Sequence, residues 1–180
     1  MKIIRDLKNI SFNTPIIASI GAFDGIHLGH QKIINKVVNK SKKENLKSAI
    51  ITFYPLPKIF FTKKNFELIS IYKKVDILKN FNLDYLIILR FNEKFISMSS
   101  KEFVENLIIQ KLNIKSLIVG EDFKFGYNQE GDIATLKYYS SKDYFSLNIE
   151  QKHNLEDERV SSSSIRTVSY THLTLPTKLA

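Results

Sequence analysis

Residues Pro15 to His30 read PIIASIGAFDGIHLGH, and they hold the clearest pattern of secondary structure in the chain. Residues 15–20 form a short apolar run, which is typical of a strand buried on both faces. The run ends at Gly21, and over residues 27–39 apolar positions recur at helical spacing. A strand, a glycine-rich loop and a helix therefore follow one another, as at the start of a parallel α/β unit.

The same alternation continues along the chain. Strands are expected at residues 48–53, 85–89, 116–119 and 144–149, and helices at 72–81, 99–112 and 132–139. Short apolar strands alternating with amphipathic helices predict an α/β fold, a Rossmann-like doubly wound parallel sheet in a single domain. Such sheets bind ligands at the carboxyl ends of their strands. The informative loops should then follow Ile20, Phe53, Leu89 and Val119.

The composition is that of a globular domain. The 180 residues are 43% hydrophobic and 25% charged, which excludes wholesale disorder and a fibrous repeat. No run approaches the ~18 apolar residues of a membrane span, and charge comes too early in the chain for a signal peptide. The absence of cysteine excludes a disulfide scaffold and thiolate metal sites. These features predict a cytoplasmic protein with no membrane partner.

The net charge of +9 comes mainly from lysine, with 23 lysines and only four arginines. Between Lys32 and Lys64, nine lysines are accompanied by a single acid, Glu44. Such a field can mark a surface for polyanions, but arginines and interleaved aromatic residues are missing over most of the stretch. A solvated lysine-rich face is the simpler interpretation, and we expect no specific nucleic-acid partner.

The glycine-rich loop and the first helical turn carry the strongest chemical signal. Gly21 and Gly25 allow the backbone to pass close to a bulky anion, and the helix start offers free N–H groups at the positive end of the helix dipole. His27 and His30 are three residues apart, so their rings should project to the same side. Gly29 leaves room for a flat base or ribose. A protonated imidazole would add positive charge at this place.

Three interpretations of the histidine pair compete. The first takes both as ordinary structural residues, with the glycines as turn formers. The second is a zinc site, which is disfavoured because the spacing is not His-Glu-x-x-His and no third ligand is evident. The third is a phosphate-binding site, which uses the strand, the glycines, the helix start and the histidines together. We favour the third.

Four motifs, taken together, resemble those of prokaryotic FAD synthetases, which belong to a nucleotidyltransferase superfamily with an H-x-G-H signature. The loop Gly21–His30 resembles the family's G-x-F-D-G-x-H-x-G-H pattern, and Thr52–Pro57 resembles its T-F-x-P-x-P turn. Further on, Val119–Gly126 is similar to the V-G-x-D-F-x-F-G loop, and Ser161–Arg166 to the S-S-T-x-I-R motif. The motifs follow the family's order over about residues 10–166, which makes the set specific.

The resemblance implies transfer of AMP from ATP to FMN, giving FAD and pyrophosphate with the help of Mg²⁺. FMN brings its own phosphate as the nucleophile, so no strong base is needed. The protein's tasks are to align the reacting groups and to neutralise the developing charge. The expected catalytic residues are His27, His30 and Arg166, all donors suited to phosphate oxygens.

The resemblance also implies two sets of binding residues. ATP would contact Gly21, Phe23, Asp24, Gly25, His27, Gly29, His30, Ser161, Ser162, Ser164 and Arg166. FMN would contact Phe53, Pro55, Pro57, Asp122, Phe123, Phe125 and Gly126. Considered without the resemblance, Phe23 is a packing residue and Asp122 is a solvated loop acid. One of the rings of Phe123 and Phe125 is expected in the core.

Two alternatives for the function stay open. One is another H-x-G-H adenylyl- or cytidylyltransferase with a different phosphorylated acceptor. The other is a non-catalytic module that binds a nucleotide or nucleic acid. The catalytic domain is expected to span residues 1–166. Residues 167–180 gain threonine and lose isoleucine abruptly, so we expect a non-native or disordered tail and no C-terminal riboflavin kinase domain.

Overall fold

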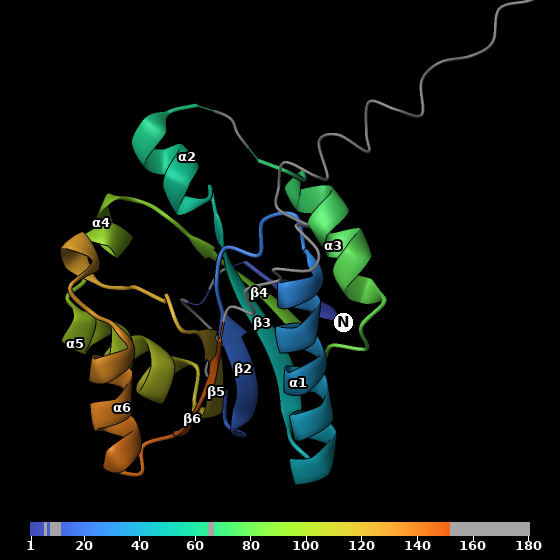
Figure 1. The fold of residues 1–180 in the computed structure, drawn as a ribbon, viewed down its shortest axis with the longest axis vertical. Helices are drawn as coiled ribbons and strands as arrows, with labels where there is room; N and C mark the ends of the chain where they lie inside the picture. The colour runs from blue at the N-terminus through green and yellow to red at the C-terminus, as the bar shows by residue number, and fades with distance from the viewer. Residues whose placement is uncertain (6, 8–11, 65–66, 152–180) are drawn as a thin grey trace, which may run out of the picture.

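The computed structural model describes residues 1–5, 7, 12–64 and 67–151. Its centre is a six-stranded parallel sheet with the strand order β1-β4-β3-β2-β5-β6 (Figure 1). The strands are β1 (Lys2–Ile4), β2 (Ile16–Ile20), β3 (Lys47–Tyr54), β4 (Tyr85–Arg90), β5 (Ile114–Gly120) and β6 (Ser146–Glu150). The doubly wound, Rossmann-like parallel sheet expected from the sequence is confirmed.

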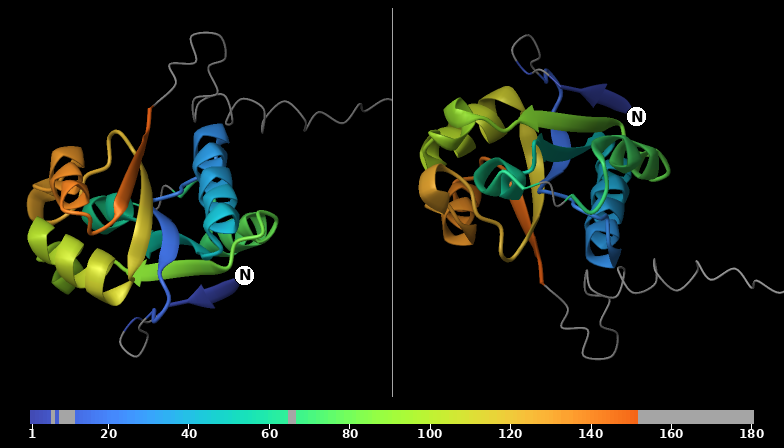
Figure 2. Two further views of the ribbon diagram at one scale, coloured as in Figure 1. Left: turned by 90° about the horizontal axis from the view of Figure 1, so that it is seen from below. Right: turned by 90° about the horizontal axis from the view of Figure 1, so that it is seen from above.

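Helices cover both faces of the sheet (Figure 2). They are α1 (Leu28–Glu44), α2 (Pro57–Thr62), α3 (Ile71–Lys79), α4 (Glu93–Ile96), α5 (Ser100–Glu102), the π-helix η1 (Phe103–Lys111), the 3-10 turn η2 (Tyr127–Gln129) and α6 (Ile133–Ser141). One buried cluster joins α1 and α3 to the sheet, and another joins η1 and α6 to its opposite face. Within the described part of the chain, none of the helices has the length and hydrophobicity that spanning a bilayer requires.

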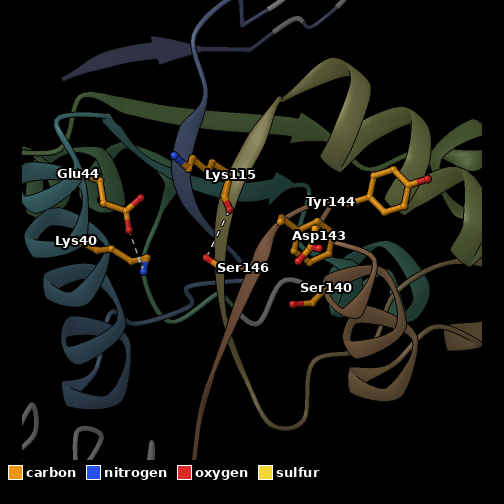
Figure 3. Close-up of a pocket in the computed structure, with 8 residues that line it drawn as sticks. Lys40, Glu44, Lys115, Ser140, Asp143, Tyr144 and Ser146 are labelled. Carbon is orange, nitrogen blue, oxygen red and sulfur yellow. Dashed lines mark hydrogen bonds and ion pairs between the residues drawn. The ribbon is translucent and has the colours of Figure 1, made fainter.

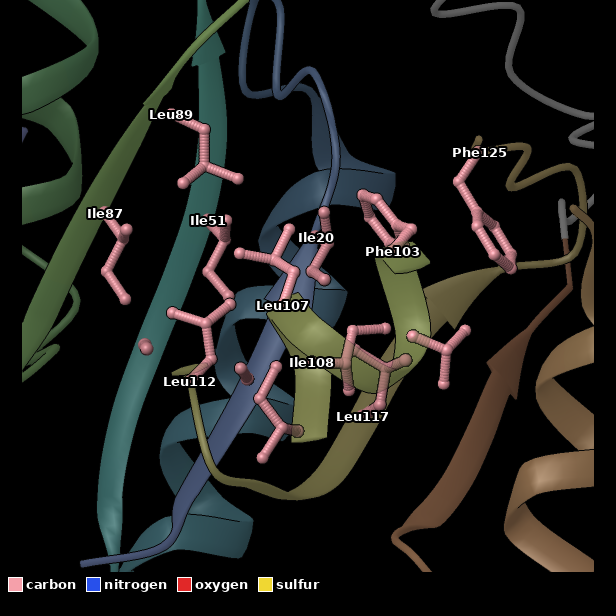
Figure 4. Close-up of a cluster of buried hydrophobic side chains, with 14 of the residues drawn as sticks. Ile20, Ile51, Ile87, Leu89, Phe103, Leu107, Ile108, Leu112, Leu117 and Phe125 are labelled. Carbon is pink, nitrogen blue, oxygen red and sulfur yellow. The ribbon is translucent and has the colours of Figure 1, made fainter. Parts of the chain in front are cut away.

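The two clusters explain why β2 consists entirely of buried residues. Successive side chains of a strand point to opposite faces, and here each face has its own cover. Ile20 joins the cluster that contains Leu107 and Ile108 of η1 (Figure 4). Ile17 packs on the other face, in the cluster with Ile34 of α1. The continuous apolar run in the sequence is therefore the signature of a central strand.

The direction of winding changes at β2. From β2 the chain adds β3 and β4 on one side, and β5 and β6 on the other. In sheets of this kind the ligand crevice lies outside the carboxyl ends of the strands, where the winding reverses. The loop after β2 and the loop after β5 meet this condition, since the two strands are direct neighbours.

Several element boundaries differ from those expected. Helix α1 continues to Glu44, well past residue 39. The apolar pattern ends before the helix does, and the lysine-rich residues that follow it are good helix formers. It ends where Asn45 adopts a left-handed conformation. At the end of the chain described, β6 begins at Ser146, while Tyr144 and Phe145 belong to the preceding turn.

Four short elements, β1, α2, α4 and η2, were not expected from the sequence, because each is too short to show a hydrophobic period. Pro57, which the resemblance assigns to the FMN contacts, is the first residue of α2, where the missing N–H of proline costs nothing. The helix expected over residues 99–112 begins where predicted, because Ser99 caps α5 and Glu102 completes a capping box.

Candidate active site

The loop after β2 has an unusual backbone conformation. Phe23 and Ile26 have positive φ angles of 46° and 41°, a region that non-glycine residues rarely adopt. Gly25 has a φ of 79°, and a Cβ there would lie 3.0 Å from Cδ1 of Leu68. The loop is therefore held in a shape that its own residues do not prefer, which requires anchors from elsewhere.

Three contacts with other elements supply these anchors. The carbonyl oxygen of Ala22 accepts hydrogen bonds from Thr52 Oγ1 of β3 and from Lys74 Nζ of α3, each at 2.9 Å. Asp24 Oδ1 accepts a hydrogen bond from the backbone N–H of Leu68, also at 2.9 Å. One oxygen of Asp24 thus holds the loop to the segment before α3, a structural role beside the ATP contact predicted for it.

The two histidines meet at the start of α1, as their spacing predicts. His27 is the N-cap residue, with no hydrogen bond from its side chain to the first turn. Its ring stacks on that of His30 with 3.8 Å between the ring centroids, and the ring of Phe23 lies 5.1 Å from His30 on centroids. His27 is exposed and His30 is half-buried. The stacked pair therefore lies at the N-terminus of α1, with His27 on its solvent-exposed side.

His30 is an uncharged imidazole at neutral pH. Burial lowers its pKa to about 3, helped by the charges of His27 and Lys74 and opposed by Asp122. Burial also lowers the pKa of His27. The positive charge expected from a protonated ring is therefore not available from His30, because desolvation of a half-enclosed ring disfavours its charged form. A neutral ring still donates one N–H hydrogen bond to a phosphate oxygen.

Nδ1 of His30 has no hydrogen-bond partner although it is buried. In the described part of the chain, the hydroxyl of Ser19 in β2 is the other buried side-chain polar atom in this state. An unpaired buried polar atom costs free energy and is uncommon in folded proteins. A catalytic role or a missing hydrogen-bonding partner such as a ligand is one explanation for such an atom.

We expect the stability of the protein to fall as the pH is lowered from about 7 towards about 4. With a folded-state pKa of about 3 for His30 and an ordinary value of 6.5, the unfolded chain takes up the proton first in this window. The contribution of His30 should approach 1.4 kcal/mol per pH unit, roughly the limit for one proton. Urea unfolding at a series of pH values measures this slope.

The matched comparison is the His30→Ala variant. Its unfolding free energy should fall less steeply over the same pH range, while the carboxylates titrate equally in both proteins. Equal slopes in the two proteins would show that the imidazole of His30 is not protected from protonation.

The loop after β5 approaches the same histidine. Asp122 influences the pKa of His30, although the two residues are far apart in the sequence. A Cβ on Gly120 would lie 3.1 Å from Asp122 Oδ1, so the carboxylate folds back over the end of β5. The fold thus brings the motif Val119–Gly126 beside the start of α1, as neighbouring parallel strands require.

The aromatic residues predicted for FMN are divided between core and surface. Phe53 and Phe125 are only 7% and 5% exposed and belong to the core, whereas Phe123 is half-buried and stacks on Phe125 at 5.5 Å between centroids. The expectation that one ring of the pair is in the core is confirmed. Phe23, in the ATP set, is also a core residue at 2% exposure. Direct contact of Phe53, Phe125 and Phe23 with a ligand stays a prediction.

Three further residues predicted to contact FMN, namely Pro55, Pro57 and Gly126, follow the carboxyl ends of β3 and β5. Pro55 follows β3 through a cis peptide bond, and Pro57 begins α2. Gly126 has a φ of 76° and lies against the backbone of Ser100. The motif that supplies Ser161, Ser162, Ser164 and Arg166 is outside the described residues. Its placement beside the histidines stays a prediction.

Sequence reasoning missed Lys74 and Thr52, the two donors that hold the carbonyl of Ala22. A signal for Lys74 was present in the sequence, because it lies four residues before the core residue Leu78 and thus on the buried face of α3. A lysine on the apolar face of a helix indicates a buried polar contact. The identity of its partner could not be read from the sequence.

A shallow pocket is present at the opposite edge of the sheet, near the amino ends of β5 and β6 (Figure 3). Its lining comprises Lys40, Glu44, Lys115, Ser140, Asp143, Tyr144, Phe145 and Ser146. Lys40 and Glu44 form an ion pair at 3.0 Å within it. No motif identified in the sequence contributes to this pocket, and its position is not that of ligand sites in doubly wound sheets.

The lysine-rich segment between Lys32 and Lys64 is partly neutralised by the fold. Lys36 pairs with Glu150, Lys40 with Glu44, and Lys47 with Asp84. Two of these three acids come from outside the segment and were not visible as partners in the sequence. The pairing fits the interpretation as a solvated face.

Comparison with known proteins agrees with this geometry. Residues 9–164 match the model of the FAD synthetase family. A bifunctional riboflavin kinase/FMN adenylyltransferase of Buchnera aphidicola subsp. Schizaphis graminum is 40% identical over 140 residues, covering 76% of this chain and 45% of the relative. The proteins of the same name from Buchnera aphidicola subsp. Acyrthosiphon pisum and Escherichia coli K12 are 34% and 31% identical, each match covering 92% of this chain and 54% of the relative.

The chain thus spans about half the length of the curated relatives it matches. Among solved structures, a chain described as a macrolide-efflux protein from Streptococcus pneumoniae aligns with a TM-score of 0.78 and 25% identity, covering 93% of this chain and 57% of that one. The match of a family model to most of the chain, together with relatives above 30% identity, establishes the family. The chain belongs to the FAD synthetase family.

Proposed function

We propose that this chain transfers AMP from ATP to FMN, producing FAD and pyrophosphate. The observation that carries the proposal is the glycine-rich loop that ends in two stacked histidines at the start of α1. This loop follows the carboxyl end of β2, where the winding reverses. Family membership supports the same activity. A cytoplasmic location is part of the proposal and fits the absence of cysteine.

In this reaction an oxygen of the FMN phosphate attacks the α-phosphorus of ATP. A new P–O bond forms, and the bond from the α-phosphorus to the bridging oxygen of the β-phosphate breaks, so that pyrophosphate leaves with the electron pair. The nucleophile is already an anion, and no proton needs to be removed from it. The protein must hold attacking and leaving oxygens in line and stabilise charge on the departing group.

The residues at the start of α1 suit this task. The N–H groups of the first helical turn have no side-chain cap, so they are free to bind phosphate oxygens. His30, as a neutral ring, is a hydrogen-bond donor without the repulsion from neighbouring cations that a charged ring would suffer. We propose that it acts with His27 on the triphosphate, and that Arg166 and the serine motif complete the ATP side. Asp122 and Phe123 belong to the proposed flavin side.

Mg²⁺ enters this proposal with the triphosphate of ATP. Among the described residues, no group of three or more histidine, aspartate or glutamate side chains is placed to hold a metal ion. We therefore assign no protein ligands to Mg²⁺ and derive no step through a protein-bound ion.

Incubation of the purified chain with ATP, Mg²⁺ and FMN tests the proposal. We expect FAD and pyrophosphate to form in equal amounts, detected by chromatography and a coupled pyrophosphate assay. Parallel reactions with CTP or without FMN should give neither product. Pyrophosphate release with another phosphorylated acceptor but not with FMN would favour a different transferase, and nucleotide binding without turnover would favour a binding module.

A further inference from the structure

Lys74 is a buried cation at the edge of the proposed ATP site. Lys74 is only 2% exposed, and its ammonium group donates a hydrogen bond to the carbonyl oxygen of Ala22 at 2.9 Å. The ion pairs identified among the described residues do not include it. Its defined partner is therefore a backbone carbonyl of the glycine-rich loop, and not a carboxylate.

Burial of the Lys74 ammonium group is energetically unfavourable. Removing an ammonium group from water is unfavourable unless strong partners compensate, and a buried apolar side chain of the same length would pack without that penalty. Burial lowers the pKa of Lys74, whereas Asp24 and Glu67 act in the opposite direction. The hydrogen bond that Lys74 donates to the carbonyl of Ala22 is one that an apolar residue could not make.

The role of Lys74 follows from the loop segment that its hydrogen bond to Ala22 anchors. Ala22 itself is exposed, and it precedes Phe23, whose positive φ begins the strained part of the loop. Thr52 holds the same carbonyl oxygen from the sheet, so Lys74 adds the second contact, from α3. The loop then leads directly to His27 and His30, and its anchoring fixes where their rings stand.

We propose that Lys74 is a positioning residue for the adenylyl-transfer site, which fixes the glycine-rich loop through the carbonyl of Ala22 and thereby sets the two histidines against the triphosphate. The inference rests on the proposed function. Lys74 itself does not touch the substrate in this assignment, because it is enclosed and its ammonium group is directed at the protein backbone.

Three variants separate this role from a merely structural one. Lys74→Met keeps the length of the side chain but loses the donor and the charge. Lys74→Gln keeps an N–H donor without the charge. Lys73→Met is the matched control, because Lys73 is the neighbouring residue on α3, carries the same charge and is exposed.

We expect Lys74→Met to lower kcat for FAD formation about 10- to 100-fold, since displacement of catalytic groups by about 1 Å has effects of this size. KM for ATP should change less than about threefold, because the loss concerns the transition state. The melting temperature should stay level or rise, because a buried charge has been replaced by an apolar group. Lys74→Gln, whose amide donor reaches one bond less far, should recover part of the turnover, and Lys73→Met should match the original protein.

Hydrogen exchange gives a readout that does not depend on activity. Backbone amides in residues 22–27 should exchange faster in Lys74→Met, with no change in β5 or α6. If the unaltered protein forms no FAD, the proposed function fails, and the exchange data still decide whether Lys74 fixes the loop.

Two results would overturn the inference. One is that Lys74→Met keeps the turnover of the unaltered protein and the same protection of residues 22–27 from hydrogen exchange. The other is a fall in melting temperature that accounts for all lost activity, with exchange accelerated throughout the protein, since that would mark Lys74 as a residue of general stability.

Discussion

Replacement of His30 by alanine is expected to lower FAD formation by about two orders of magnitude while leaving the fold in place. The imidazole stands in the first turn of α1 against His27 and Phe23, and its Nδ1 is buried without a partner. Negative charge grows on the departing pyrophosphate in the transition state, and loss of one donor aimed at such charge typically costs ~10²–10³ in turnover. Turnover at saturating ATP and FMN, with thermal unfolding alongside, measures both effects.

The stability of the variant follows from two opposing changes. Truncation removes packing against the ring of Phe23, and it also removes an unsatisfied buried nitrogen. Alanine is in addition a good helix former. We therefore expect a small change in melting temperature, comparable with that of Asn35→Ala, a control at an exposed position of the same helix.

His30→Gln refines the test, since its amide N–H reaches about as far as the Nε2 of the imidazole. Partial recovery of turnover would support donation of a hydrogen bond as the function of His30. Unchanged turnover in His30→Ala at saturating substrates would reject the catalytic role. A collapse of melting temperature together with activity would make His30 a structural residue.

The largest effect on stability is expected from Gly126→Ala. Gly126 has φ 76° and ψ 177°, a combination essentially restricted to glycine. A Cβ there would lie 2.7 Å from the backbone nitrogen and 2.8 Å from the Cα of Ser100. Backbone atoms at the start of α5 cannot move aside as a side-chain end does. We expect the free energy of unfolding to fall by about 3 kcal/mol, or the melting temperature by roughly 6–12 °C.

Two further variants identify the cause. Tyr127→Ala changes the exposed neighbouring side chain without affecting the backbone and should leave the melting temperature nearly unchanged. Adding Ser100→Gly to Gly126→Ala removes only the Cβ of Ser100, which is a more distant contact, so it should not restore stability. If Gly126→Ala had the same melting temperature as the original protein, the loop would be shown to adapt at little cost.

The architecture and the pairing of the two histidines could be predicted from local patterns in the sequence. The apolar run over residues 16–20 has no polar face, so it predicted a strand covered on both sides, and the structure places it at the centre of the sheet. The spacing of His27 and His30 predicted that they share one side of a helical turn, and their rings stack. These features depend on periodicity, which is local and can be read from neighbouring positions.

Contacts between residues far apart in the sequence became known from the folded structure. The sequence offered no reason to join Lys74 to Ala22, because the packing of α3 against the loop after β2 brings them together. It placed the loops that carry His30 and Asp122 at the same end of the sheet, but the influence of Asp122 on the pKa of His30 depends on the packed fold. The protonation of His30 belongs to the same class. Its spacing suggested a donor that could be charged, but its charge depends on how far the surrounding chain excludes water, and only the packed fold fixes that exclusion.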